Sequence, residues 1–361
     1  MLSLLSILLT AGISAVHGAC TTGTISSLSD VSSAQGCATV NINGFTVPAG
    51  QGFTLSLANN AVVNLKGNIL FGNQSWAGPL FTISGKNITF NGNGYLFDGG
   101  GPFYWDGQGS NGGVTKPRPM MKIKMSGVFQ NTKIVNSPAQ CFSVSNPAPL
   151  TISSVYIDNS QGDQPNANSG GLAAGHNTDG FDASTTDLTI TGCTIKNQDD
   201  FLAINKGSNI VFTNNTCSGG HGVSIGSITS NVVVNGVVIS NNHLSNADQA
   251  LRIKTDAVAT NSTVTNITYS GNTGTGLRQF GLLIDQSYPD TLGTPGTGVI
   301  ISNVNFITST TSLTVNSGAE RVALNCGKGS CTGSWNWSYL KTSGGKAGPI
   351  TNPPTISGSY Q

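Results

Sequence analysis

Short apolar runs separated by Gly and Asn recur along most of the chain. Asp187–Ile190, Asn209–Phe212 and Asn231–Val234 each join a polar turn residue to an apolar, mostly β-branched run, and their starts are evenly spaced along the chain. Runs of this length between turn residues are typical of strands. The three- and four-residue apolar spacing of a helix is not sustained over a helical length, and only the segment Ser27–Ser33 suits a short helix.

A repeat of about 22 residues with several strands in each unit predicts an all-β fold, a parallel β-helix. Each coil would bury its Val, Ile and Leu against the next coil, because no single coil can cover its own apolar face. We expect one domain over residues 19–361, with a short capping helix near its N-terminus. The Pro- and Gly-rich segments 98–119 and 289–298 are interpreted as loops on this scaffold.

Composition excludes several classes of protein. Hydrophobic residues make up 37% of the chain and charged residues only 9%, with 48 Gly and a net charge of +1. Helical proteins contain more Ala, Leu, Glu and Lys than this. A nucleic-acid groove needs clustered Lys and Arg, which are missing here, so we expect no nucleic-acid partner.

Residues 1–18 have the features of a secretory signal peptide. The apolar run Leu2–Leu9 is followed by small residues, and Val16 and Gly18 suit a cut before Ala19. The run is too short to cross a bilayer, so the mature protein is expected to be secreted and free of membrane. Six Asn-x-Ser/Thr sequons make it a candidate glycoprotein.

The seven cysteines fit an oxidising compartment. Cys20 with Cys37, and Cys326 with Cys331, are each close enough in sequence to close a local loop. The odd number leaves at least one free thiol among the three that remain, Cys141, Cys193 and Cys217.

Polar chemistry gathers in four short blocks between residues 177 and 254. The spacing from Asp179 to Asp200 equals the spacing from Asp200 to His221, and both are close to one repeat. Arg252 and Lys254 lie two apart on an expected strand, so both face the same side. Spacing close to one coil predicts that these side chains form a ladder along one groove.

Adjacent carboxylates add a geometric condition. Asp199 and Asp200 would face opposite sides of a regular strand, so both reach the groove only at a strand end or a bulge. Crowded carboxylates raise the pKa of at least one member, which keeps a proton available for acid–base hydrolysis of a glycoside. The two cations beyond them suit an anionic substrate such as a uronate sugar.

These blocks closely resemble those of the polygalacturonases, the pectin-hydrolysing enzymes of glycoside hydrolase family 28, of the fungal endo-acting type. The matching segments are Asn177-Thr-Asp-Gly180, Asp199-Asp200, Gly220-His-Gly222, Arg252-Ile-Lys254 and Ser287-Tyr-Pro289, with Tyr104-Trp-Asp-Gly107, Asn136-Ser-Pro-Ala-Gln140 and Trp335-Asn-Trp337 outside them. The resemblance implies a right-handed parallel β-helix, inverting hydrolysis of α-1,4-galacturonan, and neither metal nor cofactor.

The resemblance also implies a role for each residue. Asp199 is expected to be the general acid, and Asp179 and Asp200 to hold and deprotonate the water. His221 is expected to tune or orient the acid. Substrate binding is assigned to Asn177, Arg252, Lys254 and Tyr288.

Other polar residues of the chain are not assigned to catalysis or substrate binding. Asp182 is expected to support the Asp179 turn. Lys122 and Lys124 form a second same-face pair of cations, which fits either the cleft or a solvated surface.

One position departs from the family pattern. The family usually has Cys directly after the aspartate pair, bonded to the Cys before Gly-Gly-His. Here that position is Phe201, which leaves Cys217 without its expected partner. We expect Phe201 to fill the space instead.

The leading hypothesis is a secreted, monomeric endo-polygalacturonase acting on polygalacturonan. An exo-acting relative would need loops that block the cleft, and no large insertion is present. A rhamnogalacturonan hydrolase lacks the histidine block found here. A pectate lyase would need calcium-binding carboxylates, and a non-catalytic wall-binding solenoid would not need the three aspartates.

Overall fold

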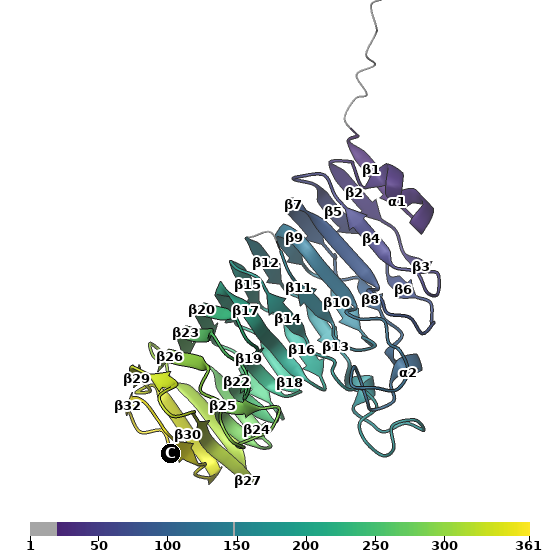
Figure 1. The fold of residues 1–361 in the computed structure, drawn as a ribbon. Helices are drawn as coiled ribbons and strands as arrows, with labels where there is room; N and C mark the ends of the chain where they lie inside the picture. Colours follow the sequence, from purple (N-terminus) through teal and green to yellow (C-terminus); the bar gives the residue numbers. More distant parts are fainter. Residues whose placement is uncertain (1–19, 147–148) are drawn as a thin grey trace, which may run out of the picture.

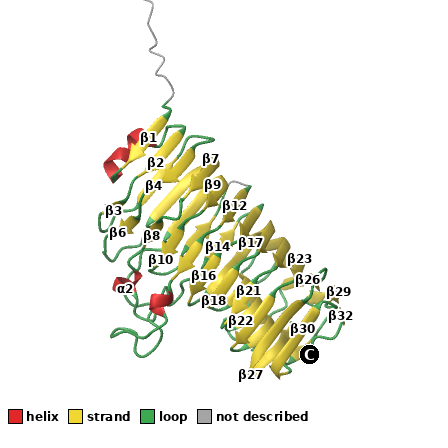
Figure 2. Ribbon diagram, turned by 180° about the vertical axis from the view of Figure 1, so that it is seen from behind, coloured by secondary structure: helices red, strands yellow, loops and turns green. Residues whose placement is uncertain are grey.

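The computed structural model describes residues 20–146 and 149–361, so the expected signal peptide lies outside the described residues. The chain winds into an elongated stack of coils, seen from opposite sides in Figures 1 and 2. In the part of the chain that the structure describes, thirty strands form one sheet whose neighbouring strands run parallel. The predicted all-β fold, a parallel β-helix, is confirmed.

The sheet has three ladders, one for each side of the coil, and the long strands bend from one ladder into another. The first ladder contains β1 (Thr22–Ile25), β2 (Thr39–Ile42), β5 (Val62–Leu65), β7 (Phe81–Asn91), β9 (Met121–Gln130), β12 (Leu150–Ser153), β15 (Leu188–Thr191), β17 (Asp200–Thr213), β20 (Val233–Ser240), β23 (Ser262–Ser270), β26 (Val299–Phe306) and β28 (Cys331–Thr332). The second contains β3 (Phe45–Val47), β6 (Ile69–Phe71), β8 (Leu96–Asp98), β10 (Lys133–Val135), β13 (Tyr156–Asp158), β16 (Thr194–Asn197), β18 (Thr216–Gly219), β21 (His243–Ser245), β24 (Thr273–Leu277), β27 (Thr311–Asn325) and β30 (Leu340–Lys346). The third contains β4 (Phe53–Ser56), the first halves of β7, β9 and β17, β11 (Phe142–Val144), β14 (Phe181–Ser184), β19 (Gly222–Ile228), β22 (Gln249–Asp256), β25 (Phe280–Tyr288), the end of β27, and β31 (Ile350–Thr351). Short helical turns α2 (Gly101–Tyr104) and η2 (Ser160–Gly162) lie in the loops that follow β8 and β13 of the second ladder.

The length of a coil varies more than the sequence repeat predicts. Leu188 pairs with Ile210, and Ile210 pairs with Val237, so the second of these two coils is the longer one. The prediction that Asn231–Val234 is the next copy of Asn209–Phe212 is therefore wrong. The extra residues lie in the turn between β19 and β20, and β20 contains two β-branched runs, only the second of which has the equivalent position.

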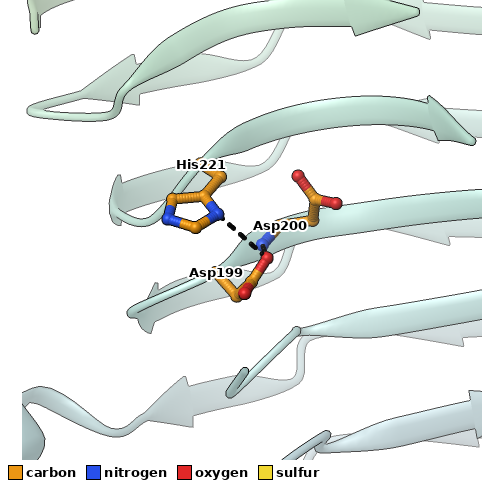
Figure 3. Close-up of side chains that lie close together, drawn as sticks. All are labelled: Asp199, Asp200 and His221. Atoms are coloured by element: carbon orange, nitrogen blue, oxygen red, sulfur yellow. Dashed lines mark hydrogen bonds and ion pairs between the residues drawn. The ribbon is translucent and has the colours of Figure 1, made fainter. Parts of the chain in front are cut away.

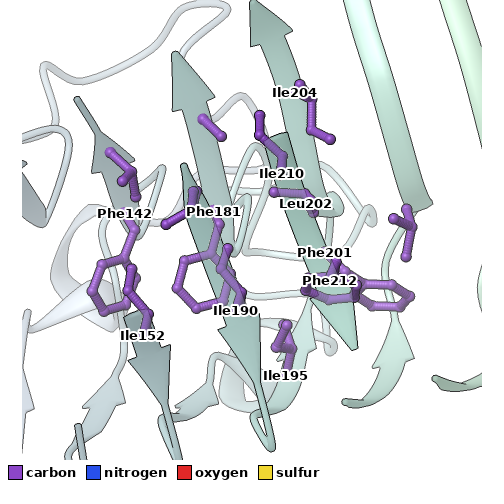
Figure 4. Packing of buried hydrophobic residues seen from close by; sticks show 14 of the residues in the cluster. Phe142, Ile152, Phe181, Ile190, Ile195, Phe201, Leu202, Ile204, Ile210 and Phe212 are labelled. Atoms are coloured by element: carbon purple, nitrogen blue, oxygen red, sulfur yellow. The ribbon is translucent and has the colours of Figure 1, made fainter. Parts of the chain in front are cut away.

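Aromatic and aliphatic side chains fill the interior of the coils. Phe90 stacks on Phe129 with ring centroids 4.4 Å apart, and Phe142 stacks on Phe181 at 4.8 Å. Figure 4 shows Phe142 and Phe181 lying side by side on neighbouring strands, next to the Ile and Leu residues of the following coils. The same inward row therefore continues beneath the groove where the polar blocks lie.

A buried ladder of asparagines holds successive coils at the turn before the second ladder. Asn215, Asn242 and Asn272 are fully buried. The Nδ2 of Asn242 donates to Asn272 Oδ1 (2.9 Å) and to the Phe212 carbonyl (3.0 Å), while its Oδ1 accepts from the backbone N and Nδ2 of Asn215 (3.0 Å each). Each asparagine thus satisfies polar groups that would otherwise be buried without partners.

Both ends of the stack are covered. At the N-terminal end, η1 (Leu28–Asp30) and α1 (Val31–Ala34) pack Leu28 and Val31 against the core, and a Cys20–Cys37 disulfide closes the turn. The predicted capping helix is confirmed.

At the other end, the strand pair β29 (Ser334–Asn336) and β32 (Thr355–Ser357) stands apart from the main sheet. Trp335 and Trp337 are buried there, and Tyr360 packs edge-on against Trp337 at 5.0 Å. This aromatic cap had no counterpart in the repeat pattern of the sequence.

Outside the N-terminal cap, two cysteines form a disulfide and three are free thiols. The predicted Cys326–Cys331 disulfide is present. Cys141, Cys193 and Cys217 are buried free thiols. No helix of the described residues is long and apolar enough to span a membrane.

We expect the buried asparagine ladder to contribute strongly to stability. Asn242→Ala would remove four buried hydrogen bonds and leave the backbone N of Asn215 without its acceptor, so it should lower the free energy of unfolding by about 3 kcal/mol or more. Asn235→Ala is the matched control, because it removes one exposed bond to Asn266 and should cost less than about 1 kcal/mol. Urea unfolding of both variants measures the difference, and equal losses would contradict this role for the ladder.

Candidate active site

All eight residues assigned to catalysis or substrate binding meet in one cleft of about 360 Å³ on the third ladder. They are Asn177 and Asp179 before β14, Asp199 before β17 and Asp200 as its first residue, His221 before β19, Arg252 and Lys254 on β22, and Tyr288 at the end of β25. The predicted ladder of polar side chains along one groove is therefore present.

A bulge turns both neighbouring aspartates toward the cleft, as their spacing predicted. Asp200 pairs with Gly222 while Leu202 pairs with Val223, so Phe201 is one extra residue in the strand. Phe201 and Leu202 are both fully buried, which leaves Asp199 and Asp200 on the cleft side. The close backbone contact also requires glycine in the next coil: a Cβ at position 220 would lie 2.2 Å from the Asp199 carbonyl oxygen.

Asp199 is held by three donors. His221 Nδ1 lies 3.1 Å from Oδ1, the Asp200 backbone N donates to Oδ1 at 2.7 Å, and Asn177 Nδ2 donates to Oδ2 at 3.1 Å. Figure 3 shows the imidazole pointing at this carboxylate from the next coil. Burial raises the pKa of Asp199, but the hydrogen bond and charge of His221 outweigh burial and lower the pKa to about 2.

His221 lies between acidic groups of different coils. Burial lowers its pKa, yet the hydrogen bond to Asp199 and the charges of Asp199, Asp200 and Asp248 raise it overall. Asp199 and His221 therefore share one proton, which in the free site is held on the imidazole. The pair forms a store of one proton next to the cleft.

Asp200 accepts a hydrogen bond on each carboxylate oxygen. Lys254 Nζ donates to one of its oxygens at 2.7 Å, and the Ser224 hydroxyl donates to the other at 2.6 Å. Burial lowers the pKa of Lys254, but the charge of Asp200 raises it overall, so the ammonium remains charged. Ser224 belongs to this site although the sequence reasoning did not select it.

Asp179 and Asp182 lie in the most unfavourable positions for a negative charge. Burial raises the pKa of Asp179 well above its usual value, and the charge of Asp199 adds to the effect. Oδ1 of Asp179 is buried and no group of the described residues reaches it. Burial also raises the pKa of Asp182 to about 7, with the charge of Asp200 as the next cause. Asp182 lines the cleft, so it does more than support the Asp179 turn.

Cations and an aromatic ring form the far end of the cleft. The ring centroid of Tyr288 lies 5.8 Å from the Arg252 guanidinium and 5.3 Å from the Lys254 ammonium. Nε of Arg252 is buried without a partner among the described residues. Donors of this kind, fixed over an aromatic ring, suit the carboxylate and hydroxyls of a uronate.

A loop from the N-terminal half forms one wall of the cleft. Asn177 adopts a left-handed conformation (φ 49°), and its Oδ1 accepts a bond from the Ser110 backbone N at 3.0 Å. Asn111 Nδ2 lies 3.3 Å from His176 Nε2. Asn177 thus ties this loop to the Asp199 carboxylate, which makes it a link between the wall and the acid.

The cluster also contains a candidate metal-ligand arrangement. One ligand atom each from Asp199, Asp200 and His221 lies within 4.8 Å of the others. Both oxygens of Asp200 already accept bonds, and His221 Nδ1 faces Asp199. The Lys254 ammonium supplies the positive charge that a metal would bring, so these residues fit an ion-pair network better than a metal centre.

Phe201 replaces the cysteine expected from the family pattern. It is fully buried and belongs to the hydrophobic core, part of which Figure 4 shows. Cys217 is a free, buried thiol, and burial raises its pKa well above the usual value. Apolar packing therefore takes the place of a disulfide between these two coils.

Comparisons with known proteins identify relatives over almost the whole chain. The sequence profile described as glycosyl hydrolases family 28 matches residues 37–358. Endopolygalacturonase I of Aspergillus aculeatus is 39% identical, covering 93% of this chain and 88% of the relative. A polygalacturonase of Cochliobolus carbonum is 43% identical, covering 86% and 84%. Among solved structures, endopolygalacturonase I of Stereum purpureum, in complex with two galacturonates, superimposes with a TM-score of 0.89 at 46% identity, covering 93% of this chain and 99% of that chain.

The raised pKa of Asp182 predicts a pH-dependent cost. The folded protein binds more protons than the unfolded chain between about pH 4 and pH 7, so this group lowers stability as pH rises through that window. Asp182→Asn should therefore raise the melting temperature relative to the parent at about pH 8, and the gain should shrink at about pH 4. Scanning calorimetry at both values measures it. Asp187→Asn, an exposed carboxylate bonded to Asn209, is the control, and a gain independent of pH would contradict the assignment.

Proposed function

The chain belongs to glycosyl hydrolase family 28, and we infer that it is an endo-polygalacturonase that hydrolyses α-1,4-galacturonosyl linkages inside polygalacturonan. We further propose that it acts as a secreted monomer and inverts the anomeric centre. The two disulfides are compatible with an oxidising compartment. The observation that carries the proposal is the cleft itself, in which a proton-holding acid pair, ionisable carboxylates and uronate-binding cations face one another.

We propose that Asp199 protonates the leaving glycosidic oxygen. The free site holds the shared proton on His221, 3.1 Å away. A bound polyanionic sugar brings another negative charge and excludes water, and both effects raise the pKa of Asp199. The proton then moves from the imidazole to the carboxylate, and His221 is left neutral when Asp199 becomes the acid.

Asp179 and Asp200 are proposed to hold the attacking water on the opposite side of the sugar. Lys254 and Ser224 hold the two oxygens of Asp200 by hydrogen bonds. The free Oδ1 of Asp179 is available to the water. Attack on the anomeric carbon transfers one proton from water to this pair while Asp199 gives one to the leaving oxygen, so charge balances across the step.

The cleft continues beyond the carboxylates, which supports internal cleavage. A second hollow of about 700 Å³ lies next to the catalytic cleft and shares Gln140 and Asp182 with it. One outward row of paired residues runs along both, in the order Lys122, Ser143, Asp182, Ala203, Ser224 and Arg252. Five steps of one coil each span roughly 24 Å, enough for several sugar residues on both sides of the scissile bond.

An unpaired arginine lines the second hollow. Arg118 is an exposed residue on its wall, and no carboxylate of the described residues pairs with it or with Lys122. Free cations beside a groove attract an anionic polymer and add contacts at a distance from the reacting bond. We propose that Arg118 binds a uronate in this part of the groove.

Removal of the acid should abolish hydrolysis. Asp199→Asn keeps the size of the side chain but has no proton to give, so reducing-end release from polygalacturonate should fall by roughly 10²- to 10⁴-fold. The parent should lower viscosity well before monomer accumulates, as internal cleavage requires. Asp187→Asn should match the parent. Full activity of Asp199→Asn would refute the assignment, and monomer as the first product would indicate exo action.

Loss of Arg118 should affect long substrates selectively. Arg118→Ala should lower kcat/KM on polygalacturonate by roughly two- to fivefold, the range of a single exposed ionic contact. Short galacturonate oligomers that do not reach the second hollow should be cleaved at the parental rate. Lys133→Ala, an exposed cation on the second ladder, is the control of equal charge. Equal effects on long and short substrates would rule out this contact.

A further inference from the structure

The imidazole of His221 lies between carboxylates of two different coils. Backbone hydrogen bonds hold the successive coils in register here. His221 N donates to the Asp199 carbonyl (2.8 Å), Asp248 N to the Gly220 carbonyl (3.0 Å), and Gln279 N to the Asp248 carbonyl (2.9 Å). Nδ1 of His221 faces Asp199 at 3.1 Å, and Nε2 faces Asp248 Oδ2 at 3.7 Å. The imidazole of His221 therefore has a carboxylate on each side, Asp199 at Nδ1 and Asp248 at Nε2.

Arg278 holds this second carboxylate and the turn that carries the histidine. Its Nε donates to Asp248 Oδ1 at 2.7 Å, and its Nη2 donates to the carbonyls of Gly219 (3.1 Å) and Gly220 (3.3 Å). Nη1 donates to the Asn246 carbonyl. One guanidinium thus fixes the two residues directly before His221, and these are glycines, which have the widest choice of backbone conformation.

Asp248 and Arg278 lie outside the lining of the catalytic cleft. His221 lines both the catalytic cleft and a hollow of about 630 Å³ on its other side, whereas Arg278 lines only that hollow. Asp248 lines neither. The Arg278 side chain is 46% exposed, so its removal opens no cavity in the core. The contacts that connect them to the catalytic cleft are those to His221 and to the two glycines before it.

We propose that Asp248 and Arg278 are positioning residues for His221. Asp248 orients the imidazole and stabilises its proton, while Arg278 holds the turn and offsets the charge of Asp248. The balance sets how readily the proton passes to Asp199. This role rests on the proposed function of Asp199 as the acid.

Opposite charges predict opposite effects. The charged and titratable groups near the imidazole are Asp199 and Asp200 at the start of β17, Asp248 before β22 and Lys254 within it, Arg278 before β25, and His176 of the loop wall. Asp248→Asn removes a negative charge that raises the pKa of His221. The alkaline limb of the kcat/KM profile should therefore move to lower pH. Arg278→Ala leaves Asp248 uncompensated, so the limb should move to higher pH, each by roughly 0.5 to 1 pH unit.

The experiment measures pH profiles of kcat/KM on polygalacturonate for the parent and both variants. Arg278→Lys restores the charge without the planar fork, so the limb should return to its parental pH while kcat recovers only in part. The matched control is Arg321→Ala, since this arginine also donates to two glycine carbonyls, those of Gly344 and Gly345, away from the cleft. It should shift neither limb.

A second readout does not depend on activity. The chain contains four histidines, so the imidazole signals of His221 can be assigned by NMR with His221→Gln and titrated in each variant. The titration should move in the same two directions as the kinetic limb. The inference would be overturned if the parent hydrolyses polygalacturonate and the two variants shift the His221 titration in the same direction or not at all. An inactive parent would instead refute the proposed function, and the titration would still decide the inference.

Discussion

The regular stacking of parallel coils is the constraint on which the site depends. Neighbouring strands of a sheet lie about 4.8 Å apart, so residues at the same place in successive coils bring their side chains into contact. Asp199 and His221 meet in this way. Ser224 reaches Asp200 of the preceding coil from two residues beyond Gly222, the residue that pairs with Asp200. A parallel β-helix therefore converts a spacing of about one coil in the sequence into hydrogen-bond distances in space. The buried asparagine ladder and the two caps hold that spacing.

The scaffold concentrates charge in a chain that otherwise contains little of it. Asp179, Asp182, Asp199 and Asp200 line one cleft, although charged residues make up only 9% of the sequence. The carboxylates do not behave alike, because each has different neighbours. The hydrogen bond and charge of His221 lower the pKa of Asp199, and Asp200 accepts a hydrogen bond from Lys254. Burial raises the pKa of Asp179 and Asp182. This difference among four similar side chains is what the proposed acid–base role of the cluster requires.

Much of this arrangement was predictable from the sequence, and the failures have physical causes. Strand alternation placed Arg252 and Lys254 on one face, and the bulge at Phe201 followed from two adjacent aspartates that had to face one cleft. The pairing of strands beyond β19 could not be predicted. β20 contains two β-branched runs, and the sequence does not show which of them pairs with β17. Ser224 could not be assigned to the site from the sequence. Only its pairing with Arg252 on the neighbouring strand places it on the side of the coil that carries the cleft. Arg278 lies in a segment outside the motifs and reaches its partners only across two coils.

The most direct test of the account is a crystal structure of Asp199→Asn with a bound galacturonate oligomer. The oligomer should lie along the third ladder with a glycosidic oxygen beside residue 199, a uronate carboxylate on Arg252 and Lys254, and further sugars passing Asp182 toward Arg118. An oligomer bound on another face of the coil, or one whose chain ends at the carboxylate cluster with nothing beyond Asp182, would contradict the account.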